Sequence, residues 1–426
     1  MADLAVETPA YIYDLDEVRR AHRLLCEAVP QPSQLLYSLK ANPHPAIIRV
    51  LALAGCAAEI CSPGELAAAL AVGLPPDRLL YTGPGKRDDD VDAAVRAGVR
   101  WFSVDSLTGL RQVRRAAAGA GSVRCLLRVN DRVPVPGQGL AMTGVASQFG
   151  IDASQVEAQP AAFQAGVAGF HLYLGSNLSD EETLIAQFAT AIATARRLAG
   201  ALAREPEVLN LGGGFGAPFA RPGDLPRFAT LAARLGALLD ESFPAWRRGR
   251  PAVVFESGRY LSSTCGYFLT RVLDVKQSHG KTVVVLESGI NHLGGMSGLR
   301  RLPPIAPELT SFAGNGQALT QAIIAGPLCT PLDTWARAAD IPAVKPGDIV
   351  RVPNVGAYGL SASLLAFLGH PPPREVVVDG GVITEVSQLA LVRQVLAGAQ
   401  RPGAATSHSG PVPPHATVPP HATAAR

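Results

Sequence analysis

A lysine that follows a short apolar run is the residue in this sequence with the clearest chemical use. Lys40 comes directly after the run 35–39, which has the composition of a β-strand. If that strand is internal, its end holds the amine out of bulk water. A desolvated lysine amine loses proton affinity and becomes a nucleophile able to form a Schiff base. Taken alone, Lys40 could also be a surface lysine, so its interpretation depends on the residues around it.

Two later segments carry groups that suit a phosphate and a protonated ring. The glycines 212–214 follow a β-rich run, where bare backbone amides can approach phosphate oxygens, although Gly-rich turns are common without a ligand. Glu256 and Arg259 share one strand end. An Arg fork makes paired hydrogen bonds to phosphate, and a carboxylate facing a pyridine nitrogen keeps that nitrogen protonated, so that the ring can accept electrons. A surface ion pair is the alternative for Glu256 and Arg259.

The elements that must position these residues read as eight strand-helix repeats. β-rich runs alternate with Ala/Leu/Arg-rich stretches of helical spacing, and the segment 62–65 has an N-cap Ser, a Pro at N1 and a capping-box Glu. The eight runs are 35–39, 57–60, 79–82, 101–104, 125–129, 169–173, 208–211 and 252–255. Repeats of this kind predict an α/β fold in the form of a TIM-like (β/α)8 barrel.

The candidate residues follow the arrangement found in barrel enzymes, which carry their chemistry at the carboxyl ends of the strands. Polar residues or glycines lie at or just after the ends of seven of the eight runs. They are Lys40, Glu59, Asp105, Asn130, Tyr173 with Ser176, the glycines 212–214, and Glu256 with Arg259. Loops are polar in any protein, but these residue types are the ones that a phosphate and a pyridine ring need.

The sequence also predicts a second domain. From residue 265 the helices give way to alternating β-runs at 267–275, 282–287, 321–324, 348–352 and 375–378. We therefore expect a cofactor-binding barrel over 31–264 and a β domain over 265–400, which the N-terminal segment 1–30 joins. Residues 401–426 are rich in Pro, Ala and His and contain a duplicated hexapeptide, so we expect a disordered tail.

Composition excludes several classes of function. The chain has 426 residues, 47% of them apolar, and a formal net charge of +3, which gives no global field for nucleic acid or anionic lipid. The N-terminus lacks the basic and apolar regions of a signal peptide, and no apolar run reaches membrane-spanning length, so we expect a cytoplasmic protein. The six cysteines are scattered, which predicts neither disulfides nor a metal site.

Seven motifs occur in an order that resembles the fold-type III pyridoxal 5′-phosphate (PLP) decarboxylases, the relatives of ornithine, diaminopimelate and arginine decarboxylases. The motifs are Tyr-Ser-Leu-Lys-Ala-Asn (37–42), Ser-Pro-Gly-Glu (62–65), Gly-Ser (175–176), Gly-Gly-Gly-Phe (212–215), Glu-Ser-Gly-Arg (256–259), Gly-Pro-Leu-Cys (326–329) and Gly-Ala-Tyr-Gly (356–359). The resemblance extends from about residue 8 to about residue 400. It implies an alanine-racemase-like barrel that binds PLP and a head-to-tail homodimer with shared active sites.

The resemblance assigns a role to each motif. It implies that Lys40 forms the Schiff base, that Glu256 faces the ring nitrogen, and that Glu59 is the acid close to the lysine. Tyr173 replaces the histidine that stacks on the ring in the common decarboxylases. The remaining implied cofactor-binding residues are Ser176, Gly213, Gly214, Gly258, Arg259 and Tyr358.

The resemblance also implies a residue offered by the neighbouring subunit. Cys329 would protonate the carbanion left after carbon dioxide departs, because a thiol is mostly protonated at neutral pH yet can give the proton up. Alone, a cysteine is more often core packing. Thr330 and Asp333 are expected to contact substrate. Thr330 stands where relatives carry an acid for a distal amine, which argues against a simple basic amino acid.

We therefore predict a biosynthetic PLP-dependent decarboxylase that removes the α-carboxylate of an amino acid. The strings at 287–292, 329–333 and 360–373 resemble a branch from antibiotic and exopolysaccharide gene clusters, including the decarboxylase of carrier-protein-bound glutamyl in butirosin biosynthesis. The substrate is accordingly a free amino acid, or one tethered to a carrier protein or conjugated to another acid. The alternatives are a racemase on the same fold, a diaminopimelate- or ornithine-type decarboxylase, and a PLP-carrier protein without turnover.

Overall fold

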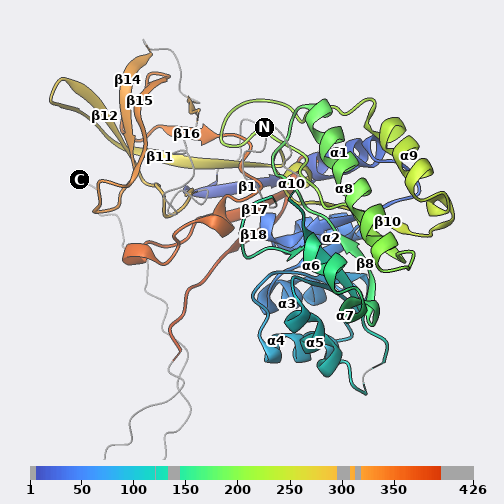
Figure 1. Ribbon diagram of the computed structural model, residues 1–426. Helices are drawn as coiled ribbons and strands as arrows, with labels where there is room; N and C mark the ends of the chain where they lie inside the picture. Colours follow the sequence, from blue (N-terminus) through green and yellow to red (C-terminus); the bar gives the residue numbers. More distant parts are fainter. Residues whose placement is uncertain (1–5, 120, 133–143, 295–307, 312–317, 395–426) are drawn as a thin grey trace, which may run out of the picture. The chain divides into compact units, whose positions relative to one another are not determined.

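The computed structural model describes residues 6–119, 121–132, 144–294, 308–311 and 318–394 (Figure 1). The chain divides into two units, residues 1–390 and 391–426, and every helix and strand below belongs to the first. The expected tail 401–426 lies outside the described residues. Within the described ranges, no helix combines the length and apolar character needed to cross a membrane.

Eight parallel strands close into a barrel, which confirms the predicted fold. The barrel strands are β2 (Gln34–Ser38), β3 (Ala57–Ile60), β4 (Leu79–Tyr81), β5 (Trp101–Val104), β6 (Arg124–Asn130), β8 (Val167–His171), β9 (Val208–Asn210) and β10 (Ala252–Ser257). Their order is β5-β4-β3-β2-β10-β9-β8-β6, and pairing of β5 with β6 closes the ring. The short strand β7 (Ile151–Asp152) adds to β6. Strand β8 ends two residues earlier than the predicted run, so Tyr173 lies in the loop beyond it.

Helices connect the strands, and their starts follow the sequence signals. The helices that follow β1 and the barrel strands are α1 (Leu15–Ala28), α2 (Pro45–Leu53), α3 (Pro63–Ala71), α4 (Asp88–Arg96), α5 (Leu107–Ala116), α6 (Ala153–Ala158), α7 (Ala161–Gln164), α8 (Glu181–Ala201), α9 (Leu231–Ser242) and α10 (Arg259–Ser262). At the start of α3 the Ser62 side chain accepts the Glu65 amide, which confirms the predicted cap. This cap starts α3 directly after the loop that follows β3.

A second sheet carries the C-terminal strands. Its members are β1 (Ala10–Asp14), β11 (Gly266–Ser278), β12 (Lys281–Leu286), β13 (Thr310–Ser311), β14 (Leu319–Ala325), β15 (Thr334–Ile341), β16 (Ile349–Val352), β17 (Arg374–Asp379) and β18 (Val382–Gln388). The path runs β15-β14-β12-β11-β1-β17-β18, with β16 branching from β11 and pairing with β13. Strand β1 pairs antiparallel with β11 and parallel with β17, so the N-terminal segment lies inside this sheet.

The two sheets meet just behind Lys40. The amide of Tyr358 donates to the carbonyl of Ala41 at 2.8 Å, and the Asn42 side chain donates to the carbonyl of Gly356 at 2.8 Å. Gly356 also lies against the first residue of β11, where a Cβ atom at position 356 would overlap the carbonyl oxygen of Ser262. This close backbone contact fixes the loop that carries Tyr358 beside the strand end that carries Lys40.

We expect the substitution Gly356→Ala to destabilise the protein, because the added methyl group has no space between two backbone segments. Overpacking of this kind costs about 1–3 kcal/mol, so the temperature of thermal unfolding should fall. Gly200→Ala is the matched control, because a Cβ there meets nothing within 4 Å and helix α8 gains up to about 1 kcal/mol from the exchange. If Gly356→Ala unfolds at the same temperature as the unsubstituted chain or at a higher one, the packing argument is wrong.

Candidate active site

Lys40 and Glu59 form an ion pair at the carboxyl ends of neighbouring strands. The Lys40 amine lies 3.0 Å from both Oε1 and Oε2 of Glu59. The Lys40 side chain is 41% exposed and that of Glu59 2%, so the amine faces the open barrel mouth above a buried carboxylate. Lys40 is the middle residue of a one-turn 3-10 helix (Leu39–Ala41) after β2, whereas Glu59 is the third residue of β3.

This pair reverses one expectation drawn from the sequence. Partial removal of the amine from water lowers its pKa. Attraction by the Glu59 carboxylate outweighs that effect and holds the pKa of Lys40 well above its ordinary value. Burial by itself raises the pKa of Glu59, yet the Lys40 charge and hydrogen bonds hold that pKa below its usual range. The lysine is therefore protonated in this state and must lose a proton before it can act as a nucleophile.

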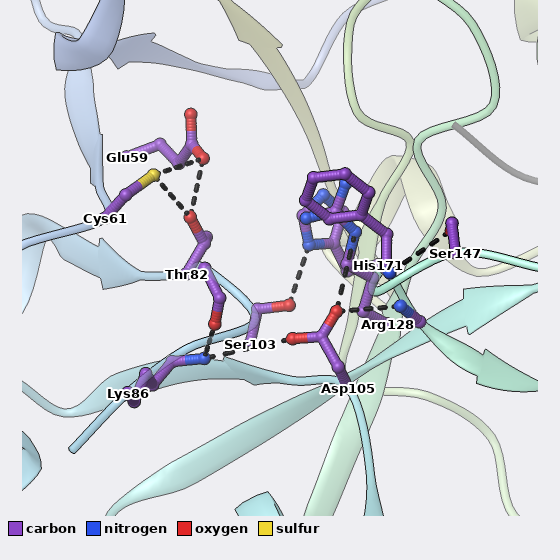
Figure 2. Close-up of polar contacts among 12 residues, drawn as sticks. Glu59, Cys61, Thr82, Lys86, Ser103, Asp105, Arg128, Ser147 and His171 are labelled. Atoms are coloured by element: carbon purple, nitrogen blue, oxygen red, sulfur yellow. Dashed lines mark hydrogen bonds and ion pairs between the residues drawn. The ribbon is translucent and has the colours of Figure 1, made fainter. Parts of the chain in front are cut away.

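Two further side chains hold the Glu59 carboxylate in place. The Thr82 hydroxyl donates to Glu59 Oε1 at 2.6 Å, and the Cys61 thiol lies 3.4 Å from the same oxygen (Figure 2). Burial and the nearby Glu59 charge raise the pKa of the Cys61 thiol, so it acts as a neutral donor. Neither residue was singled out from the sequence. Thr82 becomes a neighbour of Glu59 only when β3 and β4 pair in this register, whereas Cys61 lies two residues beyond Glu59 along the chain.

Glu256 lies on β10, beside the strand that leads to Lys40. Strands β10 and β2 pair with Glu256 opposite Leu36, so the carboxylate and the lysine share one barrel mouth. Glu256 is 1% exposed, and its Oε1 accepts a hydrogen bond at 2.7 Å from the side-chain amide of Asn210 on β9. A buried carboxylate held by a neutral amide can pair with a cationic group on a ligand.

The glycines 212–214 form a tight bend directly after β9. Gly212 and Gly214 have φ values of +68° and +102°, which side chains rarely tolerate. A Cβ atom on Gly213 would overlap the Glu256 carbonyl oxygen, and one on Gly214 would lie 2.8 Å from the carbonyl of Gly175. The bend therefore lies against both Glu256 and the loop that carries Ser176, and its bare amides suit an anion.

Arg259 and Tyr358 meet on the other side of Lys40. The Arg259 guanidinium carbon lies 4.7 Å from the centroid of the Tyr358 ring. Burial raises the pKa of the Tyr358 hydroxyl, and the Lys40 charge opposes this shift. Gly258 packs between them and the strand end, because a Cβ there would lie 2.7 Å from that of Ala41. A guanidinium at the start of α10 and a phenol from the loop between β16 and β17 thus lie at the mouth.

Tyr173 and a cationic network lie on the far side of the mouth. The Arg128 guanidinium lies between the rings of Phe149 and Tyr173, with its carbon 4.6 and 5.9 Å from their centroids. Asp105 lies 4.0 Å from both Arg128 and Lys86 (Figure 2). Burial lowers the pKa of the Lys86 amine to about 8, while the Asp105 charge acts in the opposite direction. The predicted role of Tyr173 as a stacking platform stays a prediction.

The loop between β14 and β15 carries the last three predicted site residues. Cys329 is exposed and Thr330 half-buried. The Asp333 carboxylate is buried, and it accepts the backbone amides of Ile290 and Leu328 at 2.8 Å each. Among the described residues, no hydrogen bond or ion pair joins this loop to the barrel mouth. Asp333 therefore braces the loop that presents Cys329, and its expected contact with substrate stays a prediction.

The residues at the mouth fit a phosphorylated pyridine. The Nε atoms of Arg259 and Arg128 are buried without a hydrogen-bond partner in the described parts of the chain. Their N–H groups can therefore donate hydrogen bonds to an anionic ligand. The backbone amides of the glycine bend suit a phosphate group. The Glu256 carboxylate suits a protonated ring nitrogen, and the Lys40 amine suits reaction with a carbonyl carbon. Fold and site together define a PLP-binding barrel enzyme.

Comparison with known proteins assigns the family. The family model "Pyridoxal-dependent decarboxylase, pyridoxal binding domain" matches residues 15–263. The L-glutamyl-[BtrI acyl-carrier protein] decarboxylase of Niallia circulans is 31% identical over 88% of this chain and 90% of its own. The chain belongs to the pyridoxal-dependent decarboxylases, and its cofactor is PLP.

Two further relatives agree with this assignment. The 2-[(L-alanin-3-ylcarbamoyl)methyl]-2-hydroxybutanedioate decarboxylase of Staphylococcus aureus is 29% identical over 85% of this chain and 92% of its own. The crystal structure of diaminopimelate decarboxylase from M. jannaschii in complex with L-lysine is 25% identical, covers 88% of each chain and has a TM-score of 0.77. The protein is thus a PLP-dependent amino-acid decarboxylase, as the sequence predicted.

We expect the substitution Glu59→Gln to make cofactor attachment easier at low pH. Without the Glu59 carboxylate, the amine loses the strongest attraction that opposes its removal from water, and the pKa of Lys40 falls. The pH midpoint for attachment of PLP to the apo-protein, followed by absorbance, should drop by at least about one unit, the size of a close charge effect. Thr82→Val is the matched control, because it removes a hydrogen bond from Glu59 but keeps the charge. A midpoint that stays constant or rises in Glu59→Gln contradicts this electrostatic account.

Proposed function

We propose that the barrel mouth performs α-decarboxylation with Lys40 as the cofactor-bearing lysine. The observation that supports this most strongly is that Lys40, with its Glu59 partner, and Glu256 face one mouth from adjacent strands. Bound PLP supplies an electron sink for the pair left when the bond to the carboxylate breaks. Glu256 would keep the ring nitrogen protonated, and Glu59 holds the Lys40 amine at the mouth.

The phosphate of PLP is held, in this proposal, by the groups around the glycine bend. The amides of Gly213 and Gly214 would be donors for the phosphate, and Gly258 keeps the backbone close to the strand end. Arg259 adds charge and Ser176 and Tyr358 add hydroxyl groups. Tyr173, which lies close to Arg128, would supply an aromatic face for the pyridine ring. Support comes from the positive φ values of Gly212 and Gly214 and from the buried Nε of Arg259, which has no hydrogen-bond partner among the described residues.

Cys329 completes the site of a second copy of the chain. Its loop is braced by Asp333 but exposes the thiol, and the neighbouring Leu332 is 71% exposed, so this surface is free to contact a partner. A head-to-tail homodimer would bring the thiol over the partner's lysine, where it protonates the α-carbon after carbon dioxide leaves. A cytoplasmic location, expected from the sequence, stays a prediction.

The substrate is, we propose, an amino acid whose distal end is neutral, tethered or conjugated. Thr330 offers no counter-charge next to Cys329, so a distal ammonium group buried there would be unpaired. Two relatives bear names that fit this class, since one acts on glutamyl attached to an acyl-carrier protein and the other on an alanyl group conjugated to a hydroxy acid. The α-amino and α-carboxylate groups of such substrates remain free to enter the site.

We expect the mixture of two inactive variants to regain activity. Lys40→Ala should lose the yellow absorption of the attached cofactor, whereas Cys329→Ala should keep it. In a mixed dimer one of the two sites has both residues, so random mixing yields about a quarter of the unsubstituted activity. A mixture as inactive as its components refutes the shared site. In the control, each variant is chemically cross-linked before the two are mixed. Subunits then cannot exchange, so no activity should return.

We expect Thr330→Asp to create activity toward free basic amino acids. A carboxylate beside Cys329 can pair with the distal ammonium of ornithine or lysine, and one charge-assisted hydrogen bond corresponds to about tenfold or more in kcat/KM. Carbon dioxide release measures this, with Thr330→Asn as the uncharged control. The unsubstituted enzyme should favour a glutamyl thioester of pantetheine over free diaminopimelate. The opposite preference refutes the proposed substrate class, and racemisation without gas release refutes decarboxylation.

A further inference from the structure

Two side chains that the sequence analysis did not single out contact the buried carboxylate of Glu256. Strands β8, β9 and β10 lie side by side, with His171 paired with Asn210 and Asn210 paired with Val254. Glu256 lies two residues beyond Val254, at the next inward position toward the carboxyl end. His171, Asn210 and Glu256 are each at most 1% exposed. Buried polar groups without a water-accessible face must be arranged against one another.

The orientation of Asn210 is determined by the glycine bend. Its Oδ1 accepts a hydrogen bond from the backbone amide of Gly212 at 2.8 Å. A backbone N–H can only donate, so the atom that faces it must be the side-chain oxygen of Asn210. The nitrogen end therefore donates to Oε1 of Glu256 at 2.7 Å. Asn210 thus joins the bend that suits the phosphate to the carboxylate that suits the ring nitrogen.

His171 approaches the same carboxylate oxygen from the other side. Its Nε2 lies 3.4 Å from Oε1 of Glu256, and it has no in-line hydrogen-bond partner among the described residues. Its Nδ1 lies 2.8 Å from the hydroxyl of Ser103 on β5, which is fully buried (Figure 2). A hydroxyl that donates to Nδ1 places the imidazole proton on Nε2, facing Glu256.

These contacts make the two carboxylate oxygens unequal. Oε1 has Asn210 as donor and His171 next to it, whereas Oε2 accepts no hydrogen bond from the part of the chain that the structure describes. We propose that His171, oriented by Ser103, is a positioning residue that joins Asn210 in holding Oε1 of Glu256, which leaves Oε2 to face the pyridine nitrogen. This inference rests on the role proposed above for Glu256.

The consequence concerns the position of one proton. An N–H group close to Oε1 stabilises the negative carboxylate, so a proton shared between Oε2 and the ring would stay on the ring nitrogen. A protonated ring accepts electrons from the breaking bond more readily than a neutral one. His171 would therefore act through Glu256, without contacting either substrate or the reacting carbon.

The test uses the holoenzyme reconstituted with PLP labelled with ¹⁵N in the ring, because the ¹⁵N chemical shift reports protonation of that nitrogen directly. His171→Leu removes the N–H group, and His171→Gln keeps an N–H donor of similar reach. We expect a protonated ring nitrogen at neutral pH in the unsubstituted enzyme and in His171→Gln. In His171→Leu the shift should move toward neutral pyridine, with kcat lowered about tenfold or more and KM changed less than about threefold.

Several results would overturn the inference. A ¹⁵N shift in His171→Leu equal to that of the unsubstituted enzyme would leave His171 with a packing role alone. If His171→Gln lost as much kcat and ring protonation as His171→Leu, His171 would likewise have a packing role alone. If His171→Leu does not fold, Ser103→Ala is measured instead, with a smaller displacement of the same shift expected. An unprotonated ring in the unsubstituted enzyme would instead refute the role of Glu256, and the inference would fall with it.

Discussion

The pairing of the first and last barrel strands is the constraint on which the site depends. Lys40 and Glu256 are 216 positions apart in the sequence, yet β2 and β10 lie side by side in parallel register. Parallel strands in a closed barrel all end at the same face, and their inward side chains must share a small volume. A one-residue slip between β2 and β10 would turn Glu256 away from the mouth. The chemistry therefore depends on closure of the ring as well as on the residues themselves.

Two buried carboxylates in this mouth differ in their partners, and this difference separates their roles. Glu59 is paired with a full positive charge on Lys40 and receives a hydroxyl from Thr82. Glu256 accepts a hydrogen bond from the neutral side-chain amide of Asn210 and lies next to the imidazole of His171. A buried anion is costly without compensation. Glu59 is already compensated within the chain, whereas Glu256 keeps one oxygen available for a cationic partner.

The second sheet contributes to the barrel site by backbone contact. The amide of Tyr358 binds the carbonyl of Ala41, and the contact between Gly356 and β11 leaves no space for a side chain. The same sheet carries the β14–β15 loop, in which Asp333 uses both carboxylate oxygens on backbone amides. The loops of this sheet thus present Tyr358 to the barrel of the same chain and leave Cys329 exposed.

The sequence by itself determined the barrel and most of the candidate site. Apolar runs, a capped helix start at Ser62 and a Gly-rich bend are local patterns, and each acts within a few residues of itself. Because barrel strands end at one face, these patterns also located Lys40, Glu59, Glu256 and Arg259. The family motifs extended this to the second sheet, where Tyr358 proved to lie against the strand end of Lys40.

The tertiary structure alone decided how these groups are charged and held. The sequence suggested a lysine with lowered proton affinity, whereas the distance to Glu59 raises the pKa of Lys40. In the sequence, Thr82, Asn210 and His171 have no feature that distinguishes them from other strand residues. The register of β3 and β4 places Thr82 beside Glu59, and the register of β8, β9 and β10 places Asn210 and His171 beside Glu256. Electrostatic interactions depend on distances between side chains of different strands, and no local pattern in a sequence encodes those distances.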